Sequence, residues 1–262
     1  NERMGAYKEP HGGILKELFL SERKADDEKL KAKNYKSWDL TQRQVCDLDL
    51  LMNGAFSPLE GFLGKADYES VCDSMRLESG VLWPLPITLD VTEKFADDLE
   101  QGETIALRDA EGVLLATLEI SDIWTPDRMS EAERVFGTTD DTHPAVHHLK
   151  SVSNPVYVGG RIRGVEPPTY YDFKLLRDTP SELRGKFRKA FSEASSPFLT
   201  GLVMFLIFGS ETRGLPDAVL QRYPDAHYHV PITRAIRSLN LSTAVGIVLY
   251  ESLREASSCH GW

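Results

Sequence analysis

Short β-type segments separated by turn residues dominate the stretch between residues 80 and 165. Residues 104–108 and 113–120 flank Asp109-Ala-Glu-Gly112, where the glycine suits the left-handed conformation that closes a hairpin. Residues 154–165 predict a further strand pair or one bulged strand. Many short strands with few helices are typical of a small barrel, so we expect one over roughly this stretch.

A helix is predicted before this region. Thr41-Gln-Arg-Gln44 has the form of a capping box, in which the Thr41 hydroxyl and the Gln44 side chain each satisfy a free backbone N–H. The helix should begin at about residue 42 and end at Gly54, a residue that commonly follows a helix. Its apolar spacing predicts that one face is buried, formed by Val45, Leu48, Leu51 and Met52.

The loop after this helix, residues 51–64 (LMNGAFSPLEGFLG), is both apolar and rich in turn residues. We interpret it as a helix end, a turn at Ser57-Pro58 and the approach to a second helix that runs through residues 68–75. Its two phenylalanines then anchor the loop to the core. The alternative is a loop that binds a ligand, but apolar anchors serve packing more often than binding.

Composition limits the function classes. The 262 residues carry a net charge of −10, which argues against a nucleic-acid or anionic-membrane surface, and the longest apolar run, residues 198–208, is too short to cross a bilayer. Three cysteines without zinc-type spacing indicate reduced thiols. With no signal sequence before Asn1, we expect a cytoplasmic protein, or an organellar one whose import peptide has been removed.

The common motifs of cofactor and metal chemistry are absent from the sequence: it has no phosphate loop, no G-x-G-x-x-G, no H-E-x-x-H and no paired C-x-x-C. His143 and His147 are four residues apart and would share a helix face, as a metal-ligand pair or as part of a polar surface. His227-Tyr-His229 lacks a recognisable third ligand. We therefore assign no metal site.

Residues 37–91, SWDLTQRQVCDLDLLMNGAFSPLEGFLGKADYESVCDSMRLESGVLWPLPITLDV, resemble the amino-terminal domain of the ATP sulfurylase (sulfate adenylyltransferase) family. The similarity continues through TIALRD, EAERVFGTTDDTHPAV, VYVGGRI and YYDFKLLRDTPSELRGKFRK and covers residues 11–189. It implies an α+β chain. Residues 1–166 would form a PUA-like β-barrel domain with helical decorations, and residues 167–262 a partial or degenerate α/β segment of the Rossmann-like nucleotidyltransferase type.

The resemblance also implies a reaction. Members of the family transfer an adenylyl group from MgATP to sulfate, which yields adenosine 5′-phosphosulfate and pyrophosphate. MgATP would be a substrate and no tightly bound cofactor is expected. The implied partners are ATP, sulfate and other copies of the chain in a homo-oligomer, with no nucleic acid and no membrane.

The resemblance breaks off after Lys189, where the family continues with Gln-Thr-Arg-Asn, a histidine pair and later Gly-Arg-Asp-His. Thr212 and Arg213 match the threonine and arginine of Gln-Thr-Arg-Asn, and we predict that they bind substrate. The alternative is an ordinary exposed turn. Residues 217–226 resemble a segment found further downstream in the family, and residues 227–262 have no counterpart. We predict no catalytic residue and a homologue with impaired or absent activity. The alternative is a non-catalytic PUA-like module that binds RNA or another subunit, and the acidic balance of the chain argues against RNA.

Overall fold

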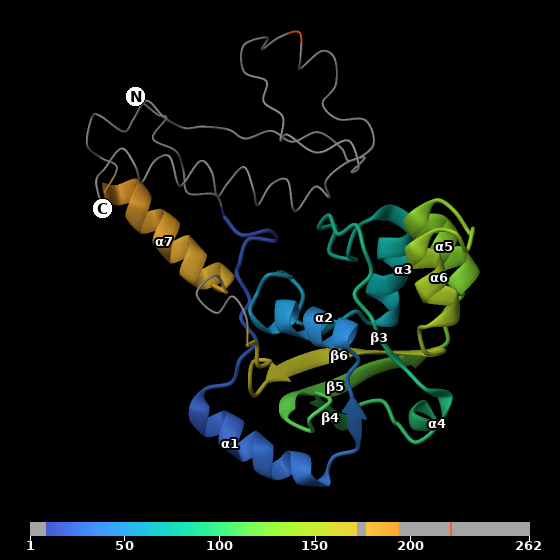
Figure 1. Ribbon diagram of the computed structural model, residues 1–262, viewed down its shortest axis with the longest axis horizontal. Helices are drawn as coiled ribbons and strands as arrows, with labels where there is room; N and C mark the ends of the chain where they lie inside the picture. Colours follow the sequence, from blue (N-terminus) through green and yellow to red (C-terminus); the bar gives the residue numbers. More distant parts are fainter. Residues whose placement is uncertain (1–8, 172–176, 194–220, 222–262) are drawn as a thin grey trace. The chain divides into compact units, whose positions relative to one another are not determined.

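The computed structural model describes residues 9–171, 177–193 and 221 (Figure 1). The chain divides into two units, Asn1–Glu193 and Ala194–Trp262, and the fold described below belongs to the first. Its helices are α1 (Glu22–Lys31), α2 (Gln42–Met52), α3 (Lys65–Ser74), α4 (Glu93–Ala96), α5 (Arg128–Phe136), α6 (Pro144–Ser151) and α7 (Pro180–Glu193), with a 3₁₀ turn at Ala32–Asn34. Its strands are β1 (Ser37–Asp39), β2 (Gly61–Phe62), β3 (Leu89–Val91), β4 (Thr104–Arg108), β5 (Leu114–Trp124) and β6 (Val156–Gly164).

The strands form one sheet in the order β1-β4-β5-β6-β2, and β3 pairs with β6 as well. The predicted hairpin is confirmed as β4 and β5, with Gly112 at φ +85° in the turn. Residues 156–164 form one continuous strand, and the bulge lies opposite it, on β5. The range predicted for the strands was too narrow, because β1 and β2 come from before residue 80 and pair with strands far along the chain.

Strand β6 contacts three other strands, and two consecutive glycines make this possible. A Cβ atom on Gly159 would lie 2.3 Å from the Leu63 carbonyl oxygen, and one on Gly160 would lie 2.1 Å from that of Glu119. On β2, a Cβ on Gly61 would lie 2.0 Å from the Gly160 carbonyl oxygen. The backbones of β2, β5 and β6 therefore approach so closely that only glycine fits at these positions.

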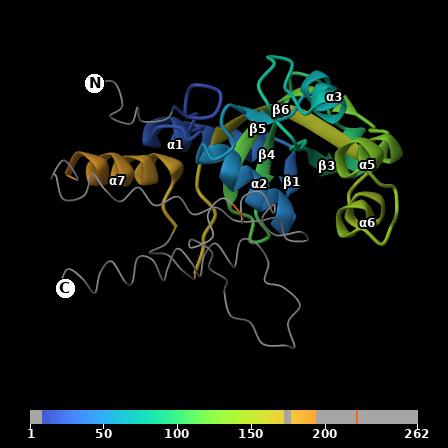
Figure 2. The ribbon, with the colours of Figure 1, turned by 90° about the horizontal axis from the view of Figure 1, so that it is seen from above.

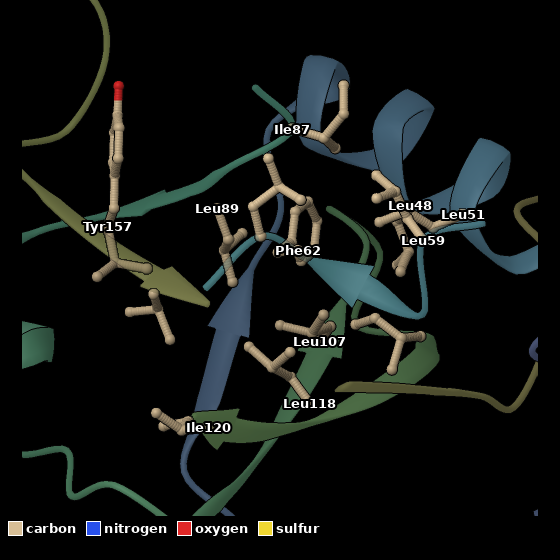
Figure 3. Close-up of a cluster of buried hydrophobic side chains, with 14 of the residues drawn as sticks. Leu48, Leu51, Leu59, Phe62, Ile87, Leu89, Leu107, Leu118, Ile120 and Tyr157 are labelled. Atoms are coloured by element: carbon tan, nitrogen blue, oxygen red, sulfur yellow. The ribbon is translucent and has the colours of Figure 1, made fainter. Parts of the chain in front are cut away.

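Helices cover both faces of the sheet (Figures 1 and 2). Helix α2 contributes its predicted apolar face to the main core, where its leucines lie near residues of β2, β4 and β5 (Figure 3). Helix α1 packs on the opposite face, where a small cluster joins Ala32 to Ala106 and Leu114. The sheet is therefore buried on two sides, which explains why β5 has buried residues on both its faces.

The apolar loop between α2 and α3 is structural, as predicted. Phe62 is 2% exposed in the main core, and the Phe56 ring packs edge-on against Trp83 with ring centroids 5.7 Å apart. The Ser57 hydroxyl donates to the Gly54 carbonyl at 2.6 Å and accepts from the Lys16 backbone N–H at 2.9 Å. These contacts fix the loop between α2 and the segment that leads into α1.

The close backbone approach at β6 yields a stability prediction. Gly160→Ala is expected to destabilise the domain by about 2–3 kcal/mol, because a methyl group cannot fit against the Glu119 carbonyl without moving a strand. Denaturant unfolding of the full chain would measure it.

The matched control is Gly185→Ala in the exposed interior of α7, where an added Cβ meets nothing within 4 Å. This substitution should stabilise the helix by about 0.5–1 kcal/mol. Equal effects of the two substitutions would contradict the argument.

Candidate functional site

The predicted pair Thr212 and Arg213 lies outside the described residues and stays a prediction. His143 and His147 do lie at the start of α6, where His143 is the N-cap residue and its ring packs on Phe136 at 5.5 Å. Both histidines are exposed. Within the described ranges, no group of three or more histidine, cysteine, aspartate or glutamate side chains is placed to hold a metal ion.

A buried carboxylate, Asp90 on β3, joins three elements. Its Oδ1 accepts from Arg43 Nη2 at 2.5 Å and from Gln44 Nε2 at 2.9 Å, both on α2. Its Oδ2 accepts from the Asn154 backbone N–H at 2.8 Å and from Asn154 Nδ2 at 3.1 Å, just before β6. Burial opposes ionisation of Asp90, but the hydrogen bonds from Asn154 and Gln44 and the charge of Arg43 outweigh it and lower its pKa.

A second buried carboxylate, Glu131 on α5, is held by neutral groups. The hydroxyls of Tyr68 and Tyr157 both donate to its Oε2, at 2.8 and 3.1 Å. Burial raises the pKa of Glu131, and the tyrosine hydrogen bonds oppose this shift only in part. Burial also raises the pKa of the nearby Cys72 thiol to about 11, so Cys72 is protonated near neutral pH.

A surface groove of about 410 Å³ lies between the edge strand β1 and helix α4. Its floor is an aromatic pair, Trp38 and Phe95, with ring centroids 5.0 Å apart and ring planes tilted by 41°. Polar and charged side chains line the rest of the groove: Ser37, Asp39, Thr92, Lys94 and Asp98. The Trp38 indole N–H donates to Gln44 Oε1 at 3.2 Å, which connects the groove floor to the Asp90 network.

Sequence reasoning missed this groove and both buried carboxylates. Gln44 was assigned only as a helix cap, a role that the structure confirms, since its side chain accepts from the Thr41 backbone N–H at 3.0 Å. Asp90 is the one charged residue in the apolar segment 81–91, and Glu131 carries no such signal in the amphipathic α5. A lone charge within a β-type run was the available clue for Asp90.

Comparisons with known proteins assign the chain to a family. A family model described as "PUA-like domain" matches residues 8–167. The chain belongs to the PUA-like domain family. This PUA-like chain has a mixed α+β fold, as expected. A second family model, described as "SpoU rRNA Methylase family", matches residues 183–250 and includes most of the segment for which no counterpart was expected.

The PUA-like chain is similar to curated sulfate adenylyltransferases, which confirms the resemblance inferred from the sequence. The enzyme of Eremothecium gossypii is 46% identical over 179 residues, 68% of this chain and 36% of that protein. Those of Neosartorya fischeri and Saccharomyces cerevisiae are 46% and 42% identical, over 69% and 68% of this chain and 32% and 35% of theirs. The chain thus spans about a third of the length of these relatives.

A solved structure, "Hexameric APS kinase from Thiobacillus denitrificans", is also similar to the PUA-like chain. It is 34% identical with a TM-score of 0.56, over 69% of this chain and 31% of that one. The described helices include none that is long and apolar enough to cross a membrane.

The raised pKa of Glu131 predicts a pH dependence. A carboxyl group whose pKa is higher in the folded than in the unfolded state contributes stability below its unfolded value, about 4.3, and loses it as pH rises through the folded value. As pH rises from 4 to 7, the stability of Glu131→Gln, measured by unfolding and expressed relative to that of the parent chain, should increase.

Glu133→Gln is the control, because Glu133 is exposed on the same helix and should leave the pH profile unchanged. A parent profile that rises from pH 4 to 7 relative to Glu131→Gln would show that Glu131 is stabilised as the anion.

Proposed function

We propose that residues 8–167 serve as the amino-terminal PUA-like domain of a sulfate adenylyltransferase, a scaffold for adenylyl transfer from MgATP to sulfate. The observation that carries this proposal is the 42–46% identity to sulfate adenylyltransferases over 179–192 residues. So long a match at this identity exceeds what a shared fold alone requires. The other expected substrates and partners, ATP, sulfate and further copies of the chain, belong to the same proposal.

The chemistry of the described residues supports a scaffold role over a catalytic one. Both carboxylate oxygens of Asp90 accept hydrogen bonds from residues of the same domain, and the carboxylate of Glu131 accepts hydrogen bonds from two buried tyrosines. Side chains whose hydrogen bonds are made within the domain stabilise and orient the elements that carry them. We therefore assign these networks to the stability of the domain.

For the chain as a whole we propose impaired or absent adenylyl transfer. Catalysis at the α-phosphate relies on cationic and hydrogen-bonding groups that offset developing charge. The sequence does not contain the Gln-Thr-Arg-Asn and Gly-Arg-Asp-His segments that the family resemblance implies for this task. Thr212 and Arg213 are the residues that we propose for any remaining anion binding. We also propose a cytoplasmic location, on the basis of the reduced cysteines.

Sulfate-dependent pyrophosphate release from MgATP tests this proposal. The purified chain should turn over at least about 100-fold more slowly than the Saccharomyces cerevisiae enzyme assayed in parallel, because loss of one charge-stabilising donor alone has an effect of this size. Molybdate replaces sulfate in a second assay.

A rate comparable to that of the yeast enzyme would refute the proposal of inactivity and leave the family assignment standing. Calorimetric titration with a non-hydrolysable MgATP analogue separates binding from turnover. Binding that is weakened by Arg213→Ala would locate a surviving anion site near that residue.

The match of residues 183–250 to the SpoU rRNA Methylase family favours a second function, methyl transfer to ribosomal RNA. We propose it for that segment alone. The match begins close to Lys189, where the sulfate adenylyltransferase resemblance ends, and to the division between the two units after Glu193. Residues 190–262 carry five arginines against six acidic residues, so this segment lacks the acidic excess of the preceding one.

Incubation of the full chain with ribosomal RNA and labelled S-adenosylmethionine tests the second function. RNA labelling that is absent from a matched truncation at residue 182 would support it and overturn the expectation that no nucleic acid binds. No labelling by a folded chain would favour the sulfate adenylyltransferase interpretation of residues 217–226.

A further inference from the structure

Strand β1 forms one end of the sheet, and no strand of the described residues pairs with its outer edge. It pairs with β4 in parallel, with Ser37 opposite Ala106 and Asp39 opposite Arg108. The Ala106 N–H donates to the carbonyl before β1, that of Lys36, at 2.8 Å. Alternate residues of a parallel strand direct their backbone groups to opposite sides, so Ser37 and Asp39 point their N–H and C=O groups away from β4.

These four outward backbone groups have no hydrogen-bond partner in the described part of the chain. Ser37 and Asp39 are both exposed, so water can reach them. An unpaired strand edge of this kind is a template for another extended chain. Because β1 has only three residues and includes a charged one, the edge is protected against indiscriminate pairing.

The groove lies directly beside this edge, since all three residues of β1 line it. The ring of Phe95, on α4, packs against that of Trp38 and completes an aromatic floor. The hydrogen bond from the Trp38 indole N–H to the Gln44 side chain restrains the position of the indole ring. A free edge next to an apolar floor is the arrangement by which sheets bind extended peptides, with backbone bonds for affinity and side-chain pockets for specificity.

The acidic side chains of the groove favour a basic binding partner. The carboxylates of Asp39 and Asp98 line it, and neither has an ion pair in the described ranges. Lys94 is the one basic residue among the described residues of the lining, and the neighbouring Lys36 is already paired with Glu103 at 2.9 Å. A second copy of this chain would bring the same carboxylates to the groove. A segment with basic side chains complements it better.

We propose that the β1 edge and its groove bind an extended basic peptide segment of a partner protein as an added strand. The peptide backbone pairs with Ser37 and Asp39, one apolar side chain rests on Trp38 and Phe95, and flanking lysine or arginine side chains face Asp39 and Asp98. This site is independent of the sulfate adenylyltransferase proposal, because it depends only on contacts within the PUA-like domain.

Fluorescence anisotropy with a labelled peptide, acetyl-TKVIVKT-amide, tests the proposal on the full chain. Saturable binding is expected. N-methylation of the amides that face β1 should weaken binding at least about tenfold, since each lost hydrogen bond has an effect of that order. N-methylation of the alternate amides should leave it nearly unchanged, and the acidic peptide acetyl-TEVIVET-amide should bind more weakly.

Protein variants test the same contacts. Asp39→Pro removes an outward backbone N–H and blocks the edge, so it should abolish peptide binding. Edge strands tolerate proline at positions whose N–H faces solvent. Asp39→Asn keeps the edge and should retain binding with reduced salt dependence. Thermal unfolding checks that each variant is folded.

Three results would overturn the proposal. The first is no saturable binding by the folded chain. The second is equal effects of the two N-methylation patterns, which would indicate apolar adsorption without strand pairing. The third is concentration-dependent dimerisation in sedimentation experiments that Asp39→Pro abolishes, which would assign the edge to a second copy of the chain.

Discussion

The close passage of three backbones at Gly159 and Gly160 is the constraint on which the rest of the domain depends. Strand β6 pairs with β5 along most of its length and also with β2 and β3, which approach from segments far earlier in the chain. Side chains at these positions would hold the strands apart. With glycine there, the loop before α3 is drawn onto the sheet, and Phe62 reaches the centre of the core (Figure 3).

Two of the buried carboxylates, Asp90 and Glu131, connect the helices to this sheet by opposite means. Asp90 receives donors from α2 and from Asn154, just before β6, which lower its pKa despite burial. Glu131 receives only tyrosine hydroxyls, so the effect of burial dominates and its pKa is raised. Two carboxylates of similar chemistry therefore have pKa values shifted in opposite directions, Asp90 by its charged and amide donors and Glu131 by burial.

Sequence reasoning predicted the elements that local chemistry determines. The Thr41 capping box, the apolar face of α2 and the glycine turn between β4 and β5 each depend on residues close together in the chain. Strands β1 and β2 were missed because two or three residues carry no periodicity, and the partner of β2 lies about a hundred residues further along the chain, at Gly160 and Arg161. The groove was missed for the same reason, since it joins β1 to α4, over fifty residues away.

The resemblance to sulfate adenylyltransferases ends, and the match to the SpoU rRNA Methylase family model begins, within helix α7. The first turn of this helix is stabilised by residues that are close together in the sequence. The Thr179 backbone N–H donates to the Glu182 carboxylate at 2.7 Å, and the Glu182 N–H donates to the Thr179 hydroxyl at 3.3 Å, a reciprocal cap like that of α2. These bonds start α7 without help from any residue beyond it. A segment of either family could therefore follow α7 without disturbing the sheet, whose contacts with β6 are complete by Gly164.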